Sequence, residues 1–152
     1  MKRTVPAEEF ERPYDLSIVI PFYNERENLR RLHEECVAAL DPLGLEFEIL
    51  VIDDGSTDDG SDVAAALAAE DHRVKLLQLT RNFGQTAALS AGFAHARGRI
   101  YVAMDADNQN DPADIPRLLA KLGEGFDVVS GWRRHRKDRL LTRRIPSMIA
   151  NR

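Results

Sequence analysis

Residues 49–56, Ile49-Leu50-Val51-Ile52-Asp53-Asp54-Gly55-Ser56, decide the fold of this 152-residue chain. Apolar, β-branched residues without alternation are typical of a parallel strand that is covered on both faces. A second apolar run, at 100–104, is followed by Asp105-Ala106-Asp107-Asn108-Gln109. In open α/β sheets, ligands bind beyond the carboxyl ends of such strands. The two acidic clusters therefore predict a site for a metal ion and a phosphorylated ligand.

The rest of the chain alternates strand patterns with helix patterns, which predicts an α/β fold with a mainly parallel sheet and flanking helices. Strands are predicted at residues 16–20, 47–52, 74–79, 100–104 and 126–130. Helices are predicted at 29–40, 56–69, 84–96 and 112–122, with Asn24 as a cap of the first. Pro21 should stop the first strand. The helix at 84–96 is so rich in Ala, Leu and Phe that most of its circumference should be buried.

Length and composition indicate one domain with an ordinary core, since 43% of the residues are hydrophobic. The formal net charge of −4 conceals a basic end, because residues 133–152 carry eight basic and one acidic side chain. A single cysteine, Cys36, excludes an intrachain disulfide and a cysteine zinc cluster, and favours a reducing compartment. No apolar stretch reaches the roughly 20 residues that span a bilayer. We therefore expect a soluble chain, or one bound at a membrane surface.

The first strand leads into Tyr23 and Glu25, an aromatic ring and a carboxylate at the same edge as Asp53 and Asp54. A ring can stack on a base, and a carboxylate can bind ribose hydroxyls or a ring N–H. The alternative is a proline turn with a half-buried tyrosine and a solvated glutamate, and taken alone this alternative is favoured.

The acidic clusters also have structural alternatives. Asp53 and Asp54 can belong to a turn in which Ser56 or Thr57 caps the next helix, but capping does not account for two consecutive carboxylates. The Asp105-Ala106-Asp107 cluster can be an acidic turn before a helix, although its oxygens suit Mg²⁺ or Mn²⁺ bound to a diphosphate. Because three polar clusters end three predicted strands, coincidence is improbable and a ligand site is favoured.

Four segments, at residues 17–25, 51–58, 81–85 and 105–109, resemble in order the motifs of the GT-A-fold glycosyltransferases of family 2. The similarity is greatest to the polyprenyl-phosphate branch, which includes dolichol-phosphate mannose synthases and bacterial enzymes that act on undecaprenyl phosphate. The resemblance covers residues 16–152 and implies a Rossmann-like nucleotide-sugar-binding core at 16–132 after an extension at 1–15. Because such relatives continue further, the chain is expected to be truncated.

The resemblance also implies roles for individual residues. The nucleotide sugar would be bound by Pro21, Tyr23, Glu25, Ile52, Asp54, Asp105 and Ala106. Asp107 and Gln109 would bind Mg²⁺ or Mn²⁺, and Asp105 and Asp107 would be the catalytic residues. Arg133 and Arg143 would face the phosphates of acceptor or donor. One departure is Asn108, which stands where the family usually has an apolar residue.

The reaction that follows is an inverting transfer of a sugar from a UDP- or GDP-sugar to a polyprenyl phosphate, at the cytoplasmic surface of a membrane. Apolar residues lie among the arginines of 133–152, so this segment is expected to bind an anionic membrane rather than nucleic acid. Three alternatives stay open: a family 2 enzyme acting on a sugar hydroxyl, a non-catalytic nucleotide-binding module, and an Asp-x-Asp phosphatase. The phosphatase is disfavoured because such enzymes carry the Asp-x-Asp motif after their first strand, whereas in this chain it follows the fourth predicted strand.

Overall fold

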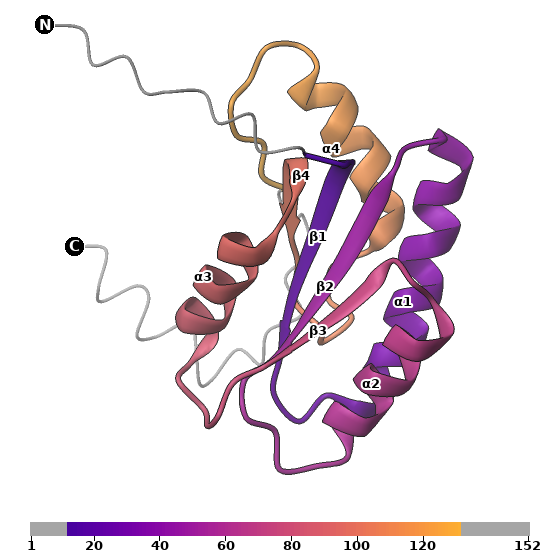
Figure 1. Ribbon diagram of the computed structural model, residues 1–152. Helices are drawn as coiled ribbons and strands as arrows, with labels where there is room; N and C mark the ends of the chain where they lie inside the picture. Colours follow the sequence, from indigo (N-terminus) through magenta and orange to yellow (C-terminus); the bar gives the residue numbers. More distant parts are fainter. Residues whose placement is uncertain (1–11, 132–152) are drawn as a thin grey trace, which may run out of the picture. The chain divides into compact units, whose positions relative to one another are not determined.

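A computed structural model describes residues 12–131, which form a parallel sheet flanked by helices (Figure 1). The chain runs through β1 (Tyr14–Phe22), α1 (Arg26–Leu40), η1 (Asp41–Leu43), β2 (Phe47–Asp53), α2 (Gly60–Glu70), β3 (Val74–Gln78), α3 (Gln85–His95), β4 (Gly98–Ala103), η2 (Pro112–Asp114) and α4 (Ile115–Leu122). It divides into two compact units, one ending at Arg117 and the other beginning at Leu118. The prediction of an α/β fold with a parallel sheet is confirmed.

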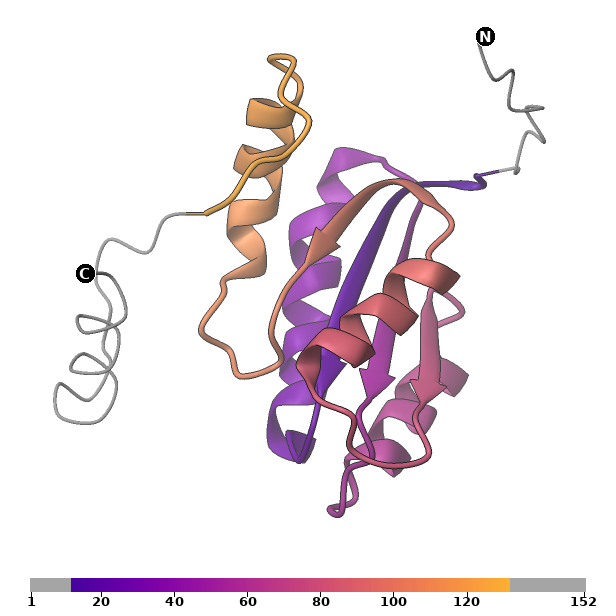
Figure 2. The same cartoon turned by 90° about the vertical axis from the view of Figure 1, so that its left-hand side faces the viewer.

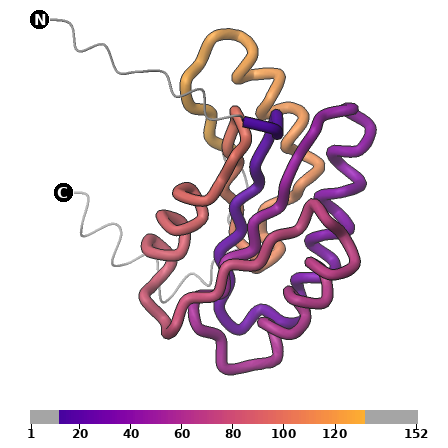
Figure 3. Tube along the Cα trace, viewed as in Figure 1, coloured from indigo at the N-terminus to yellow at the C-terminus, as the bar shows by residue number. Residues whose placement is uncertain are grey.

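The sheet has the order β3-β2-β1-β4, and all of its neighbouring strands are parallel. Helices α1 and α2 lie side by side on one face and α3 lies on the other (Figures 1 and 2). The chain trace shows β1 between β2 and β4 (Figure 3). All seven residues of β2 are buried, as the unbroken apolar pattern predicts for a strand covered on both faces.

Pro21 does not stop the first strand, which continues to Phe22. The ladder with β4 ends at the pair Val19 and Ala103, after which the Met104 N–H donates to the Val19 carbonyl. Strand residues alternate sides, so the nitrogen of Pro21 faces the side that β4 has already left, while the Phe22 carbonyl accepts from Asp54 N–H on the β2 side. The missing donor of the proline therefore breaks no ladder bond, and the prediction was wrong for this reason.

Helix α3 is less buried than its composition predicts, since only Ala88 and Gly92 are buried and Phe93 is 41% exposed. Gly92 packs directly on the sheet, where an added Cβ would lie 2.4 Å from Val19 Cγ1. This close approach confines the contact to one narrow side of the helix. Phe93 instead pairs with Tyr101 of β4, with 5.9 Å between ring centroids.

The predicted fifth strand at 126–130 is absent from the described part of the chain. Phe126 and Val128 are 51% and 83% exposed, and within its own unit Lys121 lies over the Phe126 ring at 5.1 Å. An apolar run becomes a strand only when a neighbour supplies hydrogen bonds, and no described strand pairs with this one.

A buried carboxylate, Glu48, joins the strands at the amino-terminal end of the sheet. Its Oε1 accepts hydrogen bonds from Ser17 Oγ (2.6 Å) and from the backbone N–H of Arg97 (2.6 Å), and its Oε2 accepts from Lys75 Nζ (2.5 Å). Burial alone would raise the pKa of Glu48, but hydrogen bonds from Lys75, Ser17 and Arg97 outweigh it and hold the pKa below its ordinary value. The group is therefore a paired buried ion that stabilises the fold away from the candidate site.

Cys36 of α1 is fully buried, with its Sγ 4.0 Å from the sulfur of Met104. Burial raises the pKa of this thiol to about 12. A protonated and inaccessible thiol is a poor nucleophile, so Cys36 has a packing role.

Candidate functional site

The candidate site lies at the carboxyl ends of β1, β2 and β4, where the three polar clusters of the sequence come to one edge of the sheet (Figure 1). Phe22 pairs with Asp53 in register, so the chain leaves β1 and β2 at the same level. Strand β4 ends opposite Val19 and leads into the Asp105-Gln109 loop. Parallel pairing thus brings together segments about 30 and 50 residues apart in sequence, as expected from the topology.

Asp54 holds a loop rather than projecting freely. It is 4% exposed, and its two carboxylate oxygens accept the backbone N–H groups of Phe83 (2.8 Å) and Gly84 (2.9 Å). The carboxyl group therefore ties the Arg81-Gly84 loop to the end of β2. Since each carboxylate oxygen can accept a second hydrogen bond, Asp54 can still receive a donor from a ligand.

Gly55 allows that loop to approach the strand. Its φ of +71° lies in the left-handed region, and a Cβ at this position would lie 2.4 Å from the carbonyl carbon of Arg81 and 2.5 Å from the nitrogen of Asn82. Backbone atoms at these distances cannot move aside without displacing the loop. Only glycine fits both the conformation and the contact.

Asp53 has a local structural role. It is 3% exposed, its Oδ1 accepts from the Ser56 N–H (2.8 Å), and its Oδ2 accepts from the Ser61 hydroxyl. Neither Ser56 nor Thr57 caps the following helix, because α2 begins later, at Gly60. The turn-stabilising alternative therefore describes Asp53, whose carboxylate holds the turn. The carboxylate of Asp54 holds the Arg81-Gly84 loop instead.

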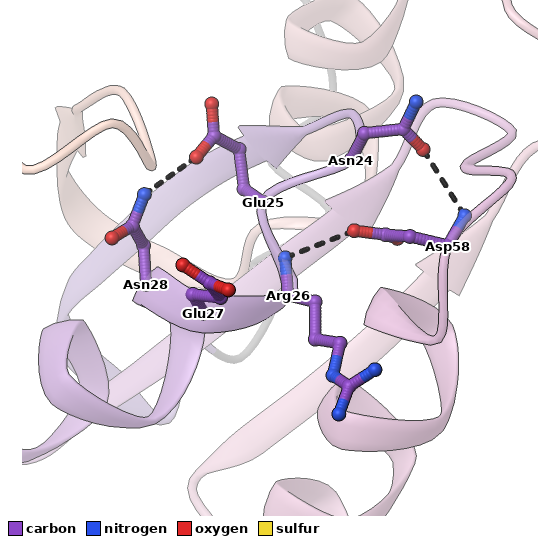
Figure 4. Close-up of a pocket in the computed structure, with 6 residues that line it drawn as sticks. All are labelled: Asn24, Glu25, Arg26, Glu27, Asn28 and Asp58. Carbon is purple, nitrogen blue, oxygen red and sulfur yellow. Dashed lines mark hydrogen bonds between the residues drawn. The ribbon is translucent and has the colours of Figure 1, made fainter.

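Asn24 joins the loop after β1 to the loop after β2. Its backbone is left-handed, with a φ of +56°, and its Oδ1 accepts from the N–H groups of Thr57 (2.8 Å) and Asp58 (3.2 Å). Asp58 in return accepts from the Arg26 N–H at 3.2 Å. The prediction that Asn24 caps α1 was wrong, because its side chain reaches across to the neighbouring loop (Figure 4).

These two loops and the first turn of α1 form the wall of an open pocket of about 340 Å³. The pocket is lined by Asn24, Glu25, Arg26, Glu27, Asn28 and Asp58 (Figure 4). Glu25 is the one residue of the predicted nucleotide-sugar set in this lining. Its Oε2 accepts a hydrogen bond from Asn28 Nδ2 at 2.6 Å.

The other residues predicted to bind the nucleoside differ in exposure. Tyr23 is 43% exposed, so its ring is available for stacking, whereas Pro21 is buried in β1. Ile52 is 0% exposed and packs in the core with Val19, Leu50 and Ala88. Its side chain can support the site from below but presents no surface to a ligand.

The Asp105-Gln109 loop combines buried and exposed positions. Asp105 is half-buried and its Oδ1 accepts from Gln85 Nε2 at 2.5 Å, while Ala106 is 3% exposed and anchors the loop. Asp107 and Gln109 are exposed, and Asp107 Oδ1 accepts the N–H of Gln109 at 3.0 Å. Two oxygen-bearing side chains are thus presented together on an accessible turn.

These side chains fit a hard divalent cation by the chemistry of their donors. A carboxylate and an amide oxygen suit Mg²⁺ or Mn²⁺, which are held by few protein ligands together with waters and substrate phosphates. Among residues 12–131, no group of three or more His, Cys, Asp or Glu side chains is arranged to bind a metal ion alone. The diphosphate of a ligand would have to complete the coordination.

Two residues that sequence reasoning missed contact the candidate residues. Gln85, the first residue of α3, donates to Asp105, and Asn28 donates to Glu25. Gln85 lies in the Arg81-Gln85 segment that carries the family resemblance, but that resemblance assigns it no role. Asn28 lies three positions after Glu25, at helical spacing.

Arg133 and Arg143, together with the basic segment 133–152, lie outside the described residues. No helix within residues 12–131 is both long enough and apolar enough to cross a bilayer.

Comparison with known proteins gives the chain a family. The family described as "Glycosyl transferase family 2" matches residues 17–151. The undecaprenyl-phosphate 4-deoxy-4-formamido-L-arabinose transferase of Shewanella sediminis is 47% identical over 137 residues, which are 90% of this chain and 41% of the relative. The enzyme of the same name from Salmonella paratyphi A is 48% identical over 138 residues, 90% of this chain and 42% of the relative. The chain therefore spans about two fifths of the length of these curated relatives.

Solved structures show the same fold. TarS from S. aureus in complex with UDP has a TM-score of 0.60 at 23% identity, over 72% of this chain and 32% of that one. The mannosyltransferase PcManGT from Pyrobaculum calidifontis, in complex with GDP-Man and Mn²⁺, has a TM-score of 0.50 at 27% identity, over 62% of this chain and 28% of that one. The expected GT-A fold is confirmed. On the match to residues 17–151, the chain belongs to glycosyl transferase family 2.

Proposed function

We propose that this chain is the donor-binding part of an inverting transferase that moves a sugar from a nucleotide diphosphate to a polyprenyl phosphate. The observation that carries the proposal is the meeting of the Tyr23-Glu25, Asp54 and Asp105-Gln109 segments at one sheet edge in a family 2 chain. The names of the relatives at 47–48% identity support undecaprenyl phosphate as the acceptor.

In this proposal the nucleoside lies against Tyr23, with its hydroxyls or ring N–H groups donating to Glu25 and Asp54. Pro21 and Ile52 support that surface from within the sheet, since both are buried. Asp105 and Ala106 lie on the ribose and sugar side, where Gln85 holds the Asp105 carboxylate at 2.5 Å. Asp107 and Gln109 would hold Mg²⁺ or Mn²⁺, which when bound neutralises the charge on the leaving diphosphate.

The transfer itself needs no general base from the chain. An oxygen of the acceptor phosphate is already anionic and attacks the anomeric carbon in line, while the bond from that carbon to the diphosphate oxygen breaks. Arg133 and Arg143 are proposed to bind the phosphates, because guanidinium groups bind them in a bidentate manner. Mass spectrometry of the lipid-linked products that the protein forms from undecaprenyl phosphate and a panel of UDP- and GDP-sugars tests the reaction. Failure to form any sugar-phosphate lipid would contradict it.

The first prediction concerns the metal. Asp107→Asn should weaken nucleoside diphosphate binding at least tenfold, about 1.4 kcal/mol, because the amide loses the charge that attracts the cation. Calorimetry of the 152-residue chain with Mg²⁺, Mn²⁺ and EDTA measures the effect. The matched control is Asp114→Asn, an exposed aspartate paired with Arg117 at 3.3 Å, which should bind as the wild type does. Equal affinities with and without EDTA would contradict the metal assignment.

The second prediction concerns residues 133–152, which we propose to bind an anionic membrane surface. Truncation after Trp132 should abolish sedimentation with phosphatidylglycerol vesicles and leave most of the nucleotide affinity intact. A control of 152 residues, in which Leu140, Leu141 and Ile145 are replaced by serine, keeps the charge and removes apolar side chains. This control should bind vesicles less tightly, because acyl chains supply part of the attraction. Binding that is unaffected by these serines, or tighter binding to duplex DNA, would show a purely electrostatic segment.

A further inference from the structure

Two asparagine side chains connect the loop after β4 to the loop after β1. Asn108 Nδ2 donates to Asn28 Oδ1 at 2.7 Å, although the two residues are 80 positions apart. Asn28 Nδ2 donates in turn to Glu25 Oε2 at 2.6 Å (Figure 4). The result is a continuous chain of hydrogen bonds from the acidic Asp105-Gln109 loop to the carboxylate of Glu25. Its two amides are called the asparagine bridge below.

The Glu25 carboxylate determines the direction of the hydrogen bonds in the asparagine bridge. An ionised carboxylate only accepts hydrogen bonds, so Asn28 must turn its NH₂ group toward Glu25. The Asn28 carbonyl oxygen then faces Asn108, which must donate. Asn108 Oδ1 is consequently turned inward, where it is buried without a hydrogen-bond partner among the described residues.

This arrangement is unfavourable for stability alone. A buried acceptor without a partner loses its hydration and gains nothing in return. The left-handed backbone of Asn108, with a φ of +56°, explains why an asparagine is tolerated, but glycine or aspartate would be tolerated there as well. Asn108 differs from glycine and aspartate in having a side-chain amide donor, and this donor forms the hydrogen bond to Asn28.

We infer that Asn28 and Asn108 are positioning residues that orient the Glu25 carboxylate for the nucleoside and join it to the metal-binding loop. The inference rests on the proposed function, in which Glu25 accepts from the nucleoside. With one carboxylate oxygen held by Asn28, the other oxygen has a fixed direction and remains available to a ligand. The orientation of Glu25 then depends on the position of the Asp105-Gln109 loop.

Reversal of the bridge is the sharpest test. In Asn108→Asp the new carboxylate cannot donate, so Asn28 must turn its NH₂ group toward position 108 and its carbonyl oxygen toward Glu25. Two acceptors then face each other and the Glu25 side chain is displaced. We expect the melting temperature to fall by roughly 4–8 °C and the affinity for the best-binding nucleoside diphosphate to fall about tenfold.

Glu25→Gln should rescue this variant. A glutamine amide can donate to the reversed Asn28 carbonyl and still present an oxygen to the ligand. Alone, Glu25→Gln should change the melting temperature little, because its oxygen can accept from Asn28. Combined with Asn108→Asp, it should restore most of the lost melting temperature and of the lost affinity. A structural role without orientation of Glu25 predicts additive losses instead.

Two further variants keep the test decisive. Asn110→Asp adds the same charge two positions further along the chain, and an equal loss of affinity there would assign the effect to charge and overturn the inference. Asn108→Gly keeps the left-handed backbone and removes the amide, so it should lower affinity without the repulsion, and Glu25→Gln should not rescue it. This variant also tests the bridge if Asn108→Asp does not fold.

The melting measurements need no ligand, which separates this inference from the proposed function. If the wild-type chain binds no nucleotide in the panel, the proposed function fails while the melting temperatures still decide whether the bridge exists. If the wild type binds but Asn108→Asp binds equally well, Glu25 is not positioned by the bridge and the inference is overturned. Additive melting shifts in the double variant would overturn it as well.

Discussion

Asp54→Ala is expected to destabilise the chain by about 3 kcal/mol or more, because two backbone N–H groups lose a buried charged acceptor, each worth roughly 1.5–3 kcal/mol. The Arg81-Gly84 loop should detach from β2, since Phe83 and Gly84 are held by the Asp54 carboxylate at 2.8 and 2.9 Å. If a base N–H also donates to this carboxylate, discrimination between UDP and GDP should fall in the same variant. Urea unfolding and calorimetry measure the two effects.

The control for this prediction is Asp59→Ala in the next turn. The Asp59 side chain is 69% exposed and pairs with Arg26 at the surface, so its loss should cost less than about 1 kcal/mol. A stability loss no larger in Asp54→Ala than in this control would contradict the loop-holding role. UDP and GDP affinities within twofold of the wild-type values would show that Asp54 does not contact the base.

Glu48→Ala should destabilise the chain by about 3–5 kcal/mol, the usual effect of removing one partner of a buried ion pair. Lys75 Nζ, Ser17 Oγ and the N–H of Arg97 all lose their common acceptor. The control is Glu46→Ala, two positions earlier in the chain. It removes the same type of side chain at an exposed position and should change stability little. Similar urea midpoints for the two variants would contradict the assigned role of Glu48.

The acid dependence of stability gives an independent check on Glu48. Because the folded-state pKa of Glu48 is held below its ordinary value, its ionised form stabilises the fold above the unfolded pKa, about 4.3. This contribution is lost as the pH falls through the folded pKa. The stabilities of the wild type and of Glu48→Gln should therefore differ most near pH 7 and converge in acid. A constant difference between pH 7 and pH 3 would contradict the pKa direction.

Sequence predicts well those parts of the fold whose burial is reflected in the residue pattern of the same segment. Residues 49–52 are apolar on both sides because β2 is covered on both faces, and the acidic residues that follow mark its end. Parallel topology then brings Asp54 and Asp107 to the same edge of the sheet. The family resemblance added which of these carboxylates to assign to a ligand.

The remaining features depend on partners that the local pattern does not specify. Residues 126–130 carry the pattern of a strand, but none of the described strands pairs with them. The bonds from Gln85 to Asp105 and from Asn108 to Asn28 join side chains that no periodicity connects. The low burial of α3 follows from its narrow contact at Gly92, which composition does not reveal.

The central place of β1 has a consequence for the order of folding. Strand β1 is the first of the described strands, and its partners lie far along the sequence. Ser17 donates to Glu48, 31 positions away, and accepts from the N–H of Gly98, 81 positions away. Pairing over such separations is slow, because a long loop must close before any contact forms. During synthesis on a ribosome, β1 and β2 can pair while β4 is still missing. The sheet edge that carries the acidic clusters is therefore completed last, and ligand binding at this edge would indicate that all four described strands have paired.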